Sequence, residues 1–402
     1  MNRTRKLLVL TVPALIVAAL VLAACIEIWT RARWDDRRGT PGFFVSHPVR
    51  VQQLSPGYHG WFAGVPVSIN RLGFRDPREY ALARSPRTIR ILVLGDSVTF
   101  GHGSVYEHSY PLLLEQRLKA WRNDIDWQVW NLGVPGYNTS QELAQLLELG
   151  PRFDPDLVIV GFYENDIVDN FPVRDATTLA KVKSSTLSFL YRHVYSIEFY
   201  KRLYLQLAWA LSRQSSYRLR LAHVAEEEQL TAVLGQMKDR PAQQLTAYDR
   251  RPDAQVAATE CAKTPSLPDD LLDSMQRERG WNDWLAAVRR FQQLNRDKVF
   301  SVAFFANVAP RTCDQEDVFM DGGSAALNRF YLKILSEGTP AVSAYDAFRP
   351  LRPSQMPDAA GHSLGNANVV KADVLFAFLR DTVLPSDLPD RAAAIVRSAR
   401  AQ

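Results

Sequence analysis

The sequence predicts an α/β protein with a doubly wound parallel sheet, a helical insertion and an N-terminal transmembrane helix. From residue 88 onward, short apolar runs of strand length such as 89–94 alternate with stretches of helical pattern. Such alternation is typical of a parallel sheet covered by helices on both faces. The alternation resumes near residue 281 after a long segment of different character, and an uncharged stretch at 7–26 precedes it all. We therefore expect a three-layer α/β/α domain that carries additions.

Composition excludes several classes of protein. The chain has 402 residues, of which 47% are hydrophobic and 23% charged, so it can bury a sizeable core and is neither disordered nor fibrous. The formal net charge is only +5, and the body has no long basic run, so no nucleic-acid partner is expected. Cys25, Cys261 and Cys313 are too few for a disulfide scaffold and lack the spacing of a zinc site. We expect no metal and no cofactor; pairing of Cys261 with Cys313 stays open.

Residues 1–30 are expected to be a membrane anchor or signal sequence. The uncharged stretch 7–26 makes a helix roughly 30 Å long, which matches the hydrocarbon core of a bilayer. Leu22-Ala-Ala-Cys25 resembles a lipobox, so a lipoprotein signal is an alternative to an uncleaved anchor. The amphipathic continuation at 26–34 favours the anchor. Because a short cationic tail resists translocation, we expect a single-pass protein with its globular domain on the extracytoplasmic, periplasmic side.

The rest of the chain divides by pattern into five further segments. A Pro- and Gly-rich lead-in with short strands covers 31–87, the first half of the sheet domain 88–170, and a helical insertion or cap 171–280. The second half covers 281–385, and a tail covers 386–402. The expected strands are 89–94, 127–131, 156–161, 299–305 and 341–345, and the expected helices are 110–121, 140–149, 281–294, 325–336 and 368–379.

Within the insertion, the aromatic-rich stretch 187–209 has a helical pattern with a broad apolar face. We expect that face to pack on the sheet domain or a neighbouring element. A role at a membrane surface or in binding an acyl chain is the alternative.

The strongest functional signal is Gly95-Asp96-Ser97, directly after the first strand. Ligands of doubly wound sheets bind beyond the carboxyl ends of the strands, so a Ser at this turn is well placed for chemistry. Thr99 excludes a Gly-x-Ser-x-Gly elbow, and no Gly-Lys-Ser/Thr of a phosphate loop follows. Three more polar or turn residues occupy matching places: Gly133 after the second strand, Asn165 after the third, and His362 before the last helix.

These four blocks resemble the SGNH (GDSL-like) hydrolase superfamily, whose blocks contribute Ser, Gly, Asn and His. The resemblance covers roughly 88–169 and 299–379 and implies a flavodoxin-like three-layer fold. The first three blocks are close to the family pattern. In the last block, Ala359 stands where the family usually has Asp, three residues before His, and Asp358 is four residues before His362.

The resemblance implies a serine hydrolase. Ser97 would attack an ester carbonyl, His362 would relay the proton, and Asp358 would orient the imidazole. The N–H groups of Ser97 and Gly133 and the side-chain amide of Asn165 would hold the oxyanion. Alternatively, Asp358 is a surface-loop acid, and a backbone carbonyl or water orients the imidazole. His102 and His108 are expected at the surface or rim.

The expected function is therefore hydrolysis of carboxylic esters, such as acetyl groups on glycans or acyl esters of lipids. The expected partners are an ester-bearing small molecule, lipid or glycan, and the membrane through the N-terminal helix. Two alternatives keep the same residues or the same fold. One is an O-acyltransferase that delivers the acyl group to a glycan hydroxyl, and the other is a non-catalytic membrane-tethered binding module.

Overall fold

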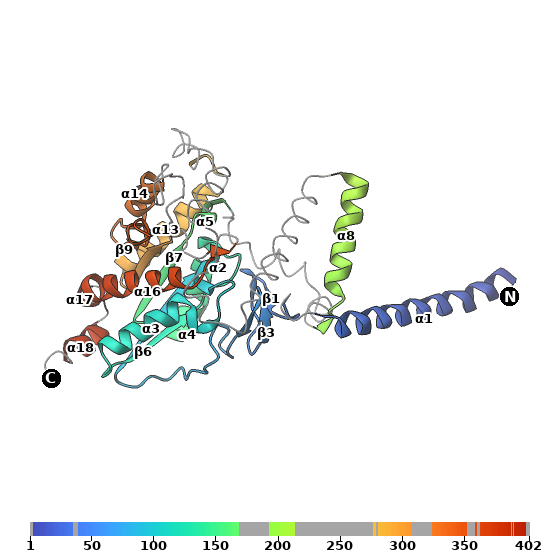
Figure 1. The fold of residues 1–402 in the computed structure, drawn as a ribbon, viewed down its shortest axis with the longest axis horizontal. Coiled ribbons are helices and arrows are strands. Elements are labelled where there is room, and N and C mark those ends of the chain that lie inside the picture. Colours follow the sequence, from blue (N-terminus) through green and yellow to red (C-terminus); the bar gives the residue numbers. More distant parts are fainter. Residues whose placement is uncertain are drawn as a thin grey trace.

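The protein is described here by a computed structural model, which places an α/β domain beside a long, separate N-terminal helix (Figure 1). The structure describes residues 3–34, 39–168, 193–213, 276–278, 280–307, 324–351, 358–359, 362–386, 388 and 390–398. Most of the expected insertion at 171–280, and with it Cys261, lies outside the described residues, as does Cys313.

A five-stranded, wholly parallel sheet is the centre of the domain, which confirms the predicted fold class. The order across the sheet is β6-β5-β7-β8-β9. Of the strands in this sheet, β5 comes first along the chain, and it lies between β6 and β7. From β7 the chain adds β8 and then β9 on the same side. The strand order reverses beside β5, and the crevice at such a point is where doubly wound sheets bind ligands. The strands are β5 (Thr88–Gly95), β6 (Asp126–Asn131), β7 (Leu157–Phe162), β8 (Val302–Ala306) and β9 (Ala341–Ser343).

Helices cover both faces of this sheet, and successive strand residues point to opposite faces. In β5, Ile91 and Val93 belong to one buried cluster and Leu92 and Leu94 to the other. The first cluster includes residues of α3 and α16, and the second includes residues of α4, α13 and α14. The continuous apolar run of β5 is thus explained by cover on both sides. The helices are α3 (Tyr110–Trp121), α4 (Thr139–Phe153), α13 (Trp281–Arg296), α14 (Ser324–Leu335) and α16 (Asn366–Phe378).

The lead-in forms two antiparallel hairpins, β1 (Phe44–His47) with β2 (Val51–Leu54) and β3 (His59–Phe62) with β4 (Val65–Ser68). Their buried side chains share one apolar cluster with Phe100, Val134 and Tyr137, which follow the ends of β5 and β6. The lead-in therefore packs on the loops at the carboxyl ends of the strands, where the candidate site lies.

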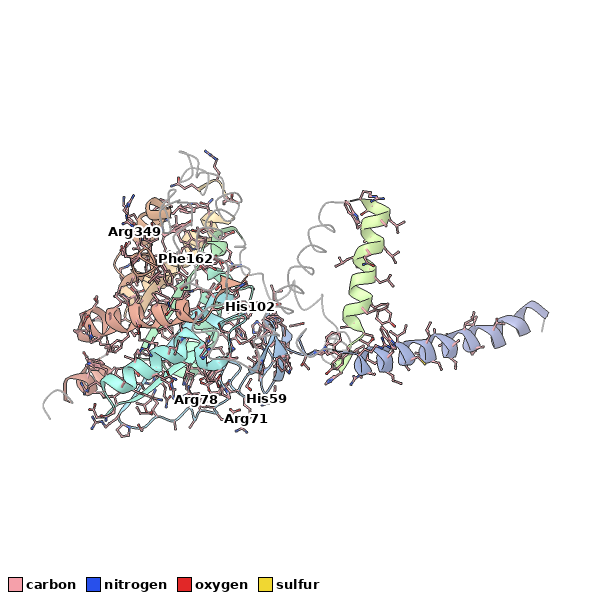
Figure 2. The ribbon with its side chains drawn as sticks, in the orientation of Figure 1. His59, Arg71, Arg78, His102, Phe162 and Arg349 are labelled. Atoms are coloured by element: carbon pink, nitrogen blue, oxygen red, sulfur yellow. The ribbon has the colours of Figure 1, made fainter. Side chains whose placement is uncertain are left out.

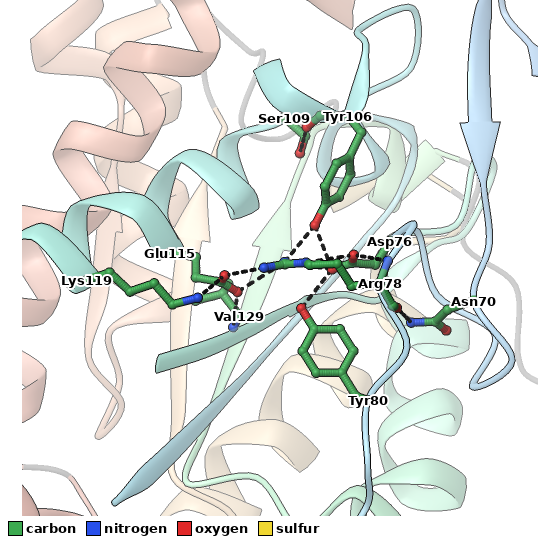
Figure 3. Close-up of polar contacts among 9 residues, drawn as sticks. All are labelled: Asn70, Asp76, Arg78, Tyr80, Tyr106, Ser109, Glu115, Lys119 and Val129. Atoms are coloured by element: carbon green, nitrogen blue, oxygen red, sulfur yellow. Dashed lines mark hydrogen bonds and ion pairs between the residues drawn. The ribbon is translucent and has the colours of Figure 1, made fainter. Parts of the chain in front are cut away.

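A buried polar network also joins the lead-in to the sheet domain (Figure 3). Arg78 pairs with Asp76 at 2.8 Å and with Glu115 of α3 at 2.6 Å. Tyr106, in the 3-10 turn Tyr106–His108, donates to Asp76 at 2.6 Å, and Tyr80 donates to the same oxygen at 2.9 Å. The two carboxylate side chains are only 1% and 2% exposed. Removing Arg78 would therefore leave the buried Asp76 carboxylate without the cation it pairs with, while Glu115 would keep its pairing with Lys119 at 2.6 Å.

The N-terminal helix α1 (Arg3–Ala32) projects away from the domain (Figure 1). Its stretch Thr11–Ala32 is long and apolar enough to span a membrane, and its most apolar part is not buried by the protein. A second helix, α8 (Ile197–Ser212), begins beside the end of α1.

Several boundaries differ from expectation in the C-terminal half. The expected strand 341–345 ends at Ser343, and Tyr345–Phe348 forms a short helix, α15, because both of its end residues turn into the core. Beyond α16 the chain continues through a π-helical turn, Leu379–Val383, into α17 (Leu384–Ser386). The expected tail contains α18 (Asp390–Ser398), which buries Ala392 and Val396 against the domain.

Candidate active site

The turn after β5 presents Ser97 as the first residue of a one-turn helix, α2 (Ser97–Phe100). The carboxylate of Asp96 caps this helix by accepting the Val98 N–H at 2.8 Å. Gly95 has no room for a side chain, because an added Cβ would lie 2.0 Å from Thr99 Oγ1. The Ser97 N–H lies in the first turn and has no acceptor within the helix. The Gly95-Asp96-Ser97 tripeptide thus builds a tight turn that leaves the hydroxyl partly exposed.

His362 reaches this turn from the other end of the sequence. It lies in β11 (His362–Ser363), which pairs with β10 (Asp358–Ala359) in a short hairpin before α16. Its Nε2 is 2.8 Å from the Ser97 Oγ, although 265 residues separate the two in the chain. The structure therefore brings the predicted nucleophile and the predicted base into direct hydrogen-bond contact.

His102, expected at the surface or rim, is half-buried and lies against His362. The two imidazole rings stack with centroids 4.2 Å apart and planes at 21°. His102 also meets the ring of Phe62, in β3, edge-on with centroids 5.1 Å apart. Figure 2 labels His102 where the sheet domain borders the lead-in. Burial, followed by the nearby charges of His362 and Arg75, holds the pKa of His102 well below its usual value. His102 thus presents a neutral ring to the ring of His362.

One sequence signal could have located His102. Gly101 adopts a left-handed conformation with φ 82°, which ends α2 after a single turn. The chain then folds back, and the His102 N–H donates to the carbonyl of Ser97 at 3.0 Å. His108, likewise expected at the surface or rim, is buried.

Gly133, predicted to hold the oxyanion, packs directly on the backbone of α2. A Cβ added to Gly133 would lie 2.3 Å from the Phe100 N. Its own N–H donates to Asn131 Oδ1 at 3.0 Å. Gly133 therefore contacts the serine turn, and its N–H has an acceptor in this conformation.

Asn165, the third predicted oxyanion residue, begins α5 (Asn165–Val168) directly beyond β7. Its side-chain amide forms a hydrogen bond with Asp96, the residue that caps the serine turn. Its Oδ1 is buried, with no hydrogen-bond partner among the described residues. Because Asp96 directly precedes Ser97, this hydrogen bond places the Asn165 amide close to the serine turn.

Three buried carboxyl groups lie under the site, and sequence analysis singled out only Asp96 among them. Burial raises the pKa of Asp96, although the Val98 N–H and the charge of His362 oppose the shift. Burial, with repulsion from Asp166 and Asp96, raises the pKa of Glu142 well above its usual value. Within the described part of the chain, neither carboxyl oxygen of Glu142 has a hydrogen-bond partner. Glu142 is therefore best accommodated in its protonated form.

The predicted triad acid, Asp358, is described only through its backbone, which lies opposite Ser363 in the β10–β11 hairpin. The Nδ1 of His362 is buried and has no hydrogen-bond partner among the described residues. The role of Asp358 thus stays a prediction. Among the residues that the structure describes, no three His, Cys, Asp or Glu side chains cluster in a way that could hold a metal ion.

The chain is similar to several known esterases. An arylesterase from Vibrio mimicus is 34% identical over 96 residues, which cover 24% of this chain and 47% of the arylesterase. The chain thus matches about half the length of that curated relative. A mutant acetylxylan esterase from Geobacillus stearothermophilus is similar with 13% identity and a TM-score of 0.37, over 73% of this chain and 93% of that one. A two-domain esterase active on acetylated mannans is 13% identical with a TM-score of 0.33, over 75% and 51%. Similarity at these TM-scores has no bearing on function.

The family comparison covers far more of the chain. The model of the GDSL-like Lipase/Acylhydrolase family matches residues 93–361, which is well over half of the sequence. The matched segment contains the serine turn, Gly133 and Asn165, and it ends one residue before His362. With Ser97 and His362 in contact at the carboxyl end of a 2-1-3-4-5 parallel sheet, the chain belongs to the GDSL-like Lipase/Acylhydrolase family.

Proposed function

We propose that this protein is a serine esterase that hydrolyses carboxylic esters through an acyl-enzyme on Ser97. The observation that carries the proposal is the 2.8 Å contact between Ser97 Oγ and His362 Nε2. A hydroxyl in contact with an imidazole is the arrangement that activates serine as a nucleophile.

The reaction proceeds in two half-steps. Ser97 Oγ attacks the carbonyl carbon while His362 Nε2 accepts its proton, and the same proton then passes to the departing alcohol as the ester C–O bond breaks. Water next gives a proton to His362 and attacks the acyl carbon. Collapse of this second intermediate releases the carboxylic acid and returns the proton to Ser97. The His102 stack supports the first half-step by limiting the rotation of the His362 ring.

The negative charge on the carbonyl oxygen needs donors beside Ser97. We assign the Ser97 N–H and the Asn165 amide to this role, each contributing about 3 kcal/mol to transition-state stabilisation. The Gly133 N–H joins them when Asn131 Oδ1 releases it, since that oxygen is its acceptor now. We assign to Asp358 the orientation of the His362 imidazole.

The substrates that we propose are acetyl or other acyl esters on glycans or lipids. The kinship with an arylesterase and the family membership support an ester. We further propose that α1 anchors the protein in the cytoplasmic membrane, with the domain on the extracytoplasmic side, because α1 has an unburied apolar surface of spanning length. Mass spectrometry of the mature N-terminus separates an uncleaved anchor from a lipoprotein processed at Cys25.

A fluorophosphonate probe on the full-length protein tests the mechanism. We expect covalent labelling of the native chain and its loss in both Ser97→Ala and His362→Ala. Ser336→Ala removes an exposed hydroxyl one residue beyond the end of α14, and this variant should label normally. Persistent labelling of Ser97→Ala, or a folded native chain that neither labels nor turns over any ester in a panel of acyl lengths, contradicts the proposal. Asp358→Ala should lower turnover if that carboxylate orients His362.

A further inference from the structure

Exposed large apolar side chains are concentrated on two helices, α1 and α8. Only three of those on the described residues lie elsewhere, namely Leu82, Leu147 and Val299. An apolar surface of this kind on a helix outside the core needs a partner. Those on α8 are Phe199, Tyr200, Leu203, Tyr204, Leu207 and Leu211.

The exposed apolar residues of α8 form a single stripe. Phe199, Leu203, Leu207 and Leu211 are spaced by four residues, so they lie one above another along the helix. Leu207 and Leu211 are 53% and 86% exposed. On the other side of the helix, Leu205 is buried. One face of α8 is thus covered by the protein, and the stripe faces away from it.

Polar contacts fix the start of α8 to the last turns of α1. The Glu27 carboxylate accepts the backbone N–H of Tyr195 at 3.0 Å and that of Ser196 at 2.9 Å, and it accepts the Ser196 hydroxyl at 2.7 Å. Glu27 therefore satisfies N–H groups at the beginning of α8 in the way that a capping side chain does. Arg31 pairs with Glu27 and donates to the His193 carbonyl.

Aromatic contacts strengthen the same junction. Trp34 meets the Tyr195 ring edge-on at 5.2 Å, and the Arg31 guanidinium lies 4.8 Å from the centre of that ring. The first residues of α8 are thus held at the end of the apolar helix, not at the sheet domain.

From this junction α8 runs crosswise to α1 (Figure 1). If α1 crosses a bilayer, a helix that starts at its end and runs across its axis lies along the membrane surface. We propose that α8 is an interfacial helix whose apolar stripe inserts into the same membrane that α1 spans. This inference rests on the proposed anchoring role of α1.

The side chains near the junction fit an anionic phospholipid surface. Trp29 is exposed, and aromatic residues of this kind gather where lipid meets water. Arg33 lies over Trp29 at 5.4 Å, and at the far end of α8 Arg213 lies over Trp209 at 5.6 Å. The Arg33–Trp29 pair at the junction matches a negative headgroup beside the inserted leucines, whereas Trp209 follows Leu205 by four residues on the covered side of α8. Because α8 starts beside the end of α1, the exposed apolar side chains of both helices can be covered by one bilayer.

The experiment measures the depth of single labels in vesicles of phosphatidylcholine and phosphatidylglycerol that hold the full-length protein. An environment-sensitive fluorophore is attached to Leu207→Cys in a chain whose three native cysteines are replaced by Ser. Quenching by doxyl-labelled lipid is compared with quenching by iodide present on both sides. Matched labels at Ser212→Cys, on the opposite side of α8 from the stripe, at Val17→Cys in α1 and at Glu337→Cys on the far side of the domain serve as references.

We expect lipid quenching at position 207 to be several-fold stronger than at 212 and 337 and to approach that at 17. Iodide quenching as strong at 207 as at 337 would show that the stripe faces water and would overturn the inference. Protection from both quenchers would overturn it in favour of cover by protein, such as a second copy of the chain. If the label at 17 also escapes lipid quenching, the anchor proposal fails as well. Turnover of a soluble ester by the same variants tests the esterase separately.

Discussion

Replacing Gly133 by Ala should damage catalysis although it removes no atom that takes part in the reaction, since the backbone N–H of residue 133 remains. The Cβ of the new side chain would lie 2.3 Å from the Phe100 N and 2.8 Å from the Thr99 carbonyl carbon. Both atoms belong to the backbone of α2, so no side chain can rotate out of the way. The helix that begins with Ser97 must move instead.

The size of the movement follows from these distances. An ordinary contact of a Cβ begins near 3.4 Å, so the 2.3 Å approach to the Phe100 N requires relief of about 1 Å (3.4 − 2.3). A misplacement of a reacting group by about 1 Å costs about 10²-fold in rate. Forcing one methyl group into a packed site also destabilises a protein by about 1–3 kcal/mol. We therefore expect kcat/KM to fall about 100-fold in a protein that still folds.

The measurement is kcat/KM on a soluble aryl ester, with thermal unfolding recorded on the same samples. Gly150→Ala is the matched control. Gly150 lies in the last turns of α4, and an added Cβ there would lie 2.6 Å from the Phe300 ring instead of the serine turn. That substitution should lower stability with little change in kcat/KM. If folded Gly133→Ala keeps kcat/KM within threefold of the native value, contact with Gly133 does not position Ser97, and the reasoning fails.

Three other substitutions test the buried polar groups. Arg78→Met should destabilise the fold by about 3 kcal/mol in denaturant unfolding, because it leaves the Asp76 and Glu115 carboxylates buried without their shared cation. His102 has a depressed pKa in the folded state, so its contribution is complete above about pH 6.5 and is lost as pH falls. His102→Phe keeps a stacking ring and should flatten the fall of the melting temperature below pH 6.5. Glu142 has a raised pKa, so its contribution is complete below about pH 4.3 and is lost as pH rises. Glu142→Gln, which mimics the protonated acid, should stabilise the protein more at pH 8 than at pH 4.

Each of these three has a contradicting result. Arg71→Met removes an exposed partner of Glu79 at 3.5 Å and should change the free energy of unfolding by less than about 1 kcal/mol. Equal losses of stability in Arg71→Met and Arg78→Met would show that the buried carboxylates do not depend on Arg78. Parallel acid melting curves for native and His102→Phe protein would show that His102 takes up a proton as readily folded as unfolded. A gain from Glu142→Gln that does not increase with pH would show that the native carboxyl is ionised.

Much of the fold could be read from the chain because local patterns dictated it. The run at 89–94 is apolar at nearly every position, which indicates cover on both faces, and β5 is indeed buried throughout. The helix expected at 110–121 is α3 with the same bounds. Where the pattern was short it failed, as at 341–345, because three strand residues and a helical turn give no period to count.

Within the site, the sequence identified residues by their place relative to strand ends. The carboxyl ends of parallel strands lie at one edge of the sheet. Ser97, Gly133 and Asn165 each follow such an end, so adjacent strands bring these three residues together. His362 was reached through the resemblance of its block to a family. The buried Glu142 was missed because a Glu in an amphipathic helix looks like a solvated residue until its neighbours are known.

The sequence alone thus determined the parallel α/β architecture, the serine turn and the apolar N-terminal helix, because each arises from residues close together in the chain. Only the tertiary structure decided that His102 stacks on His362, that the Asn165 amide bonds to Asp96, and that Glu27 caps a helix almost 170 residues away. These contacts join segments whose separation is set by the whole path of the chain. No local propensity encodes that path, because it is the packing of the two faces of the sheet and of the lead-in that brings such segments together.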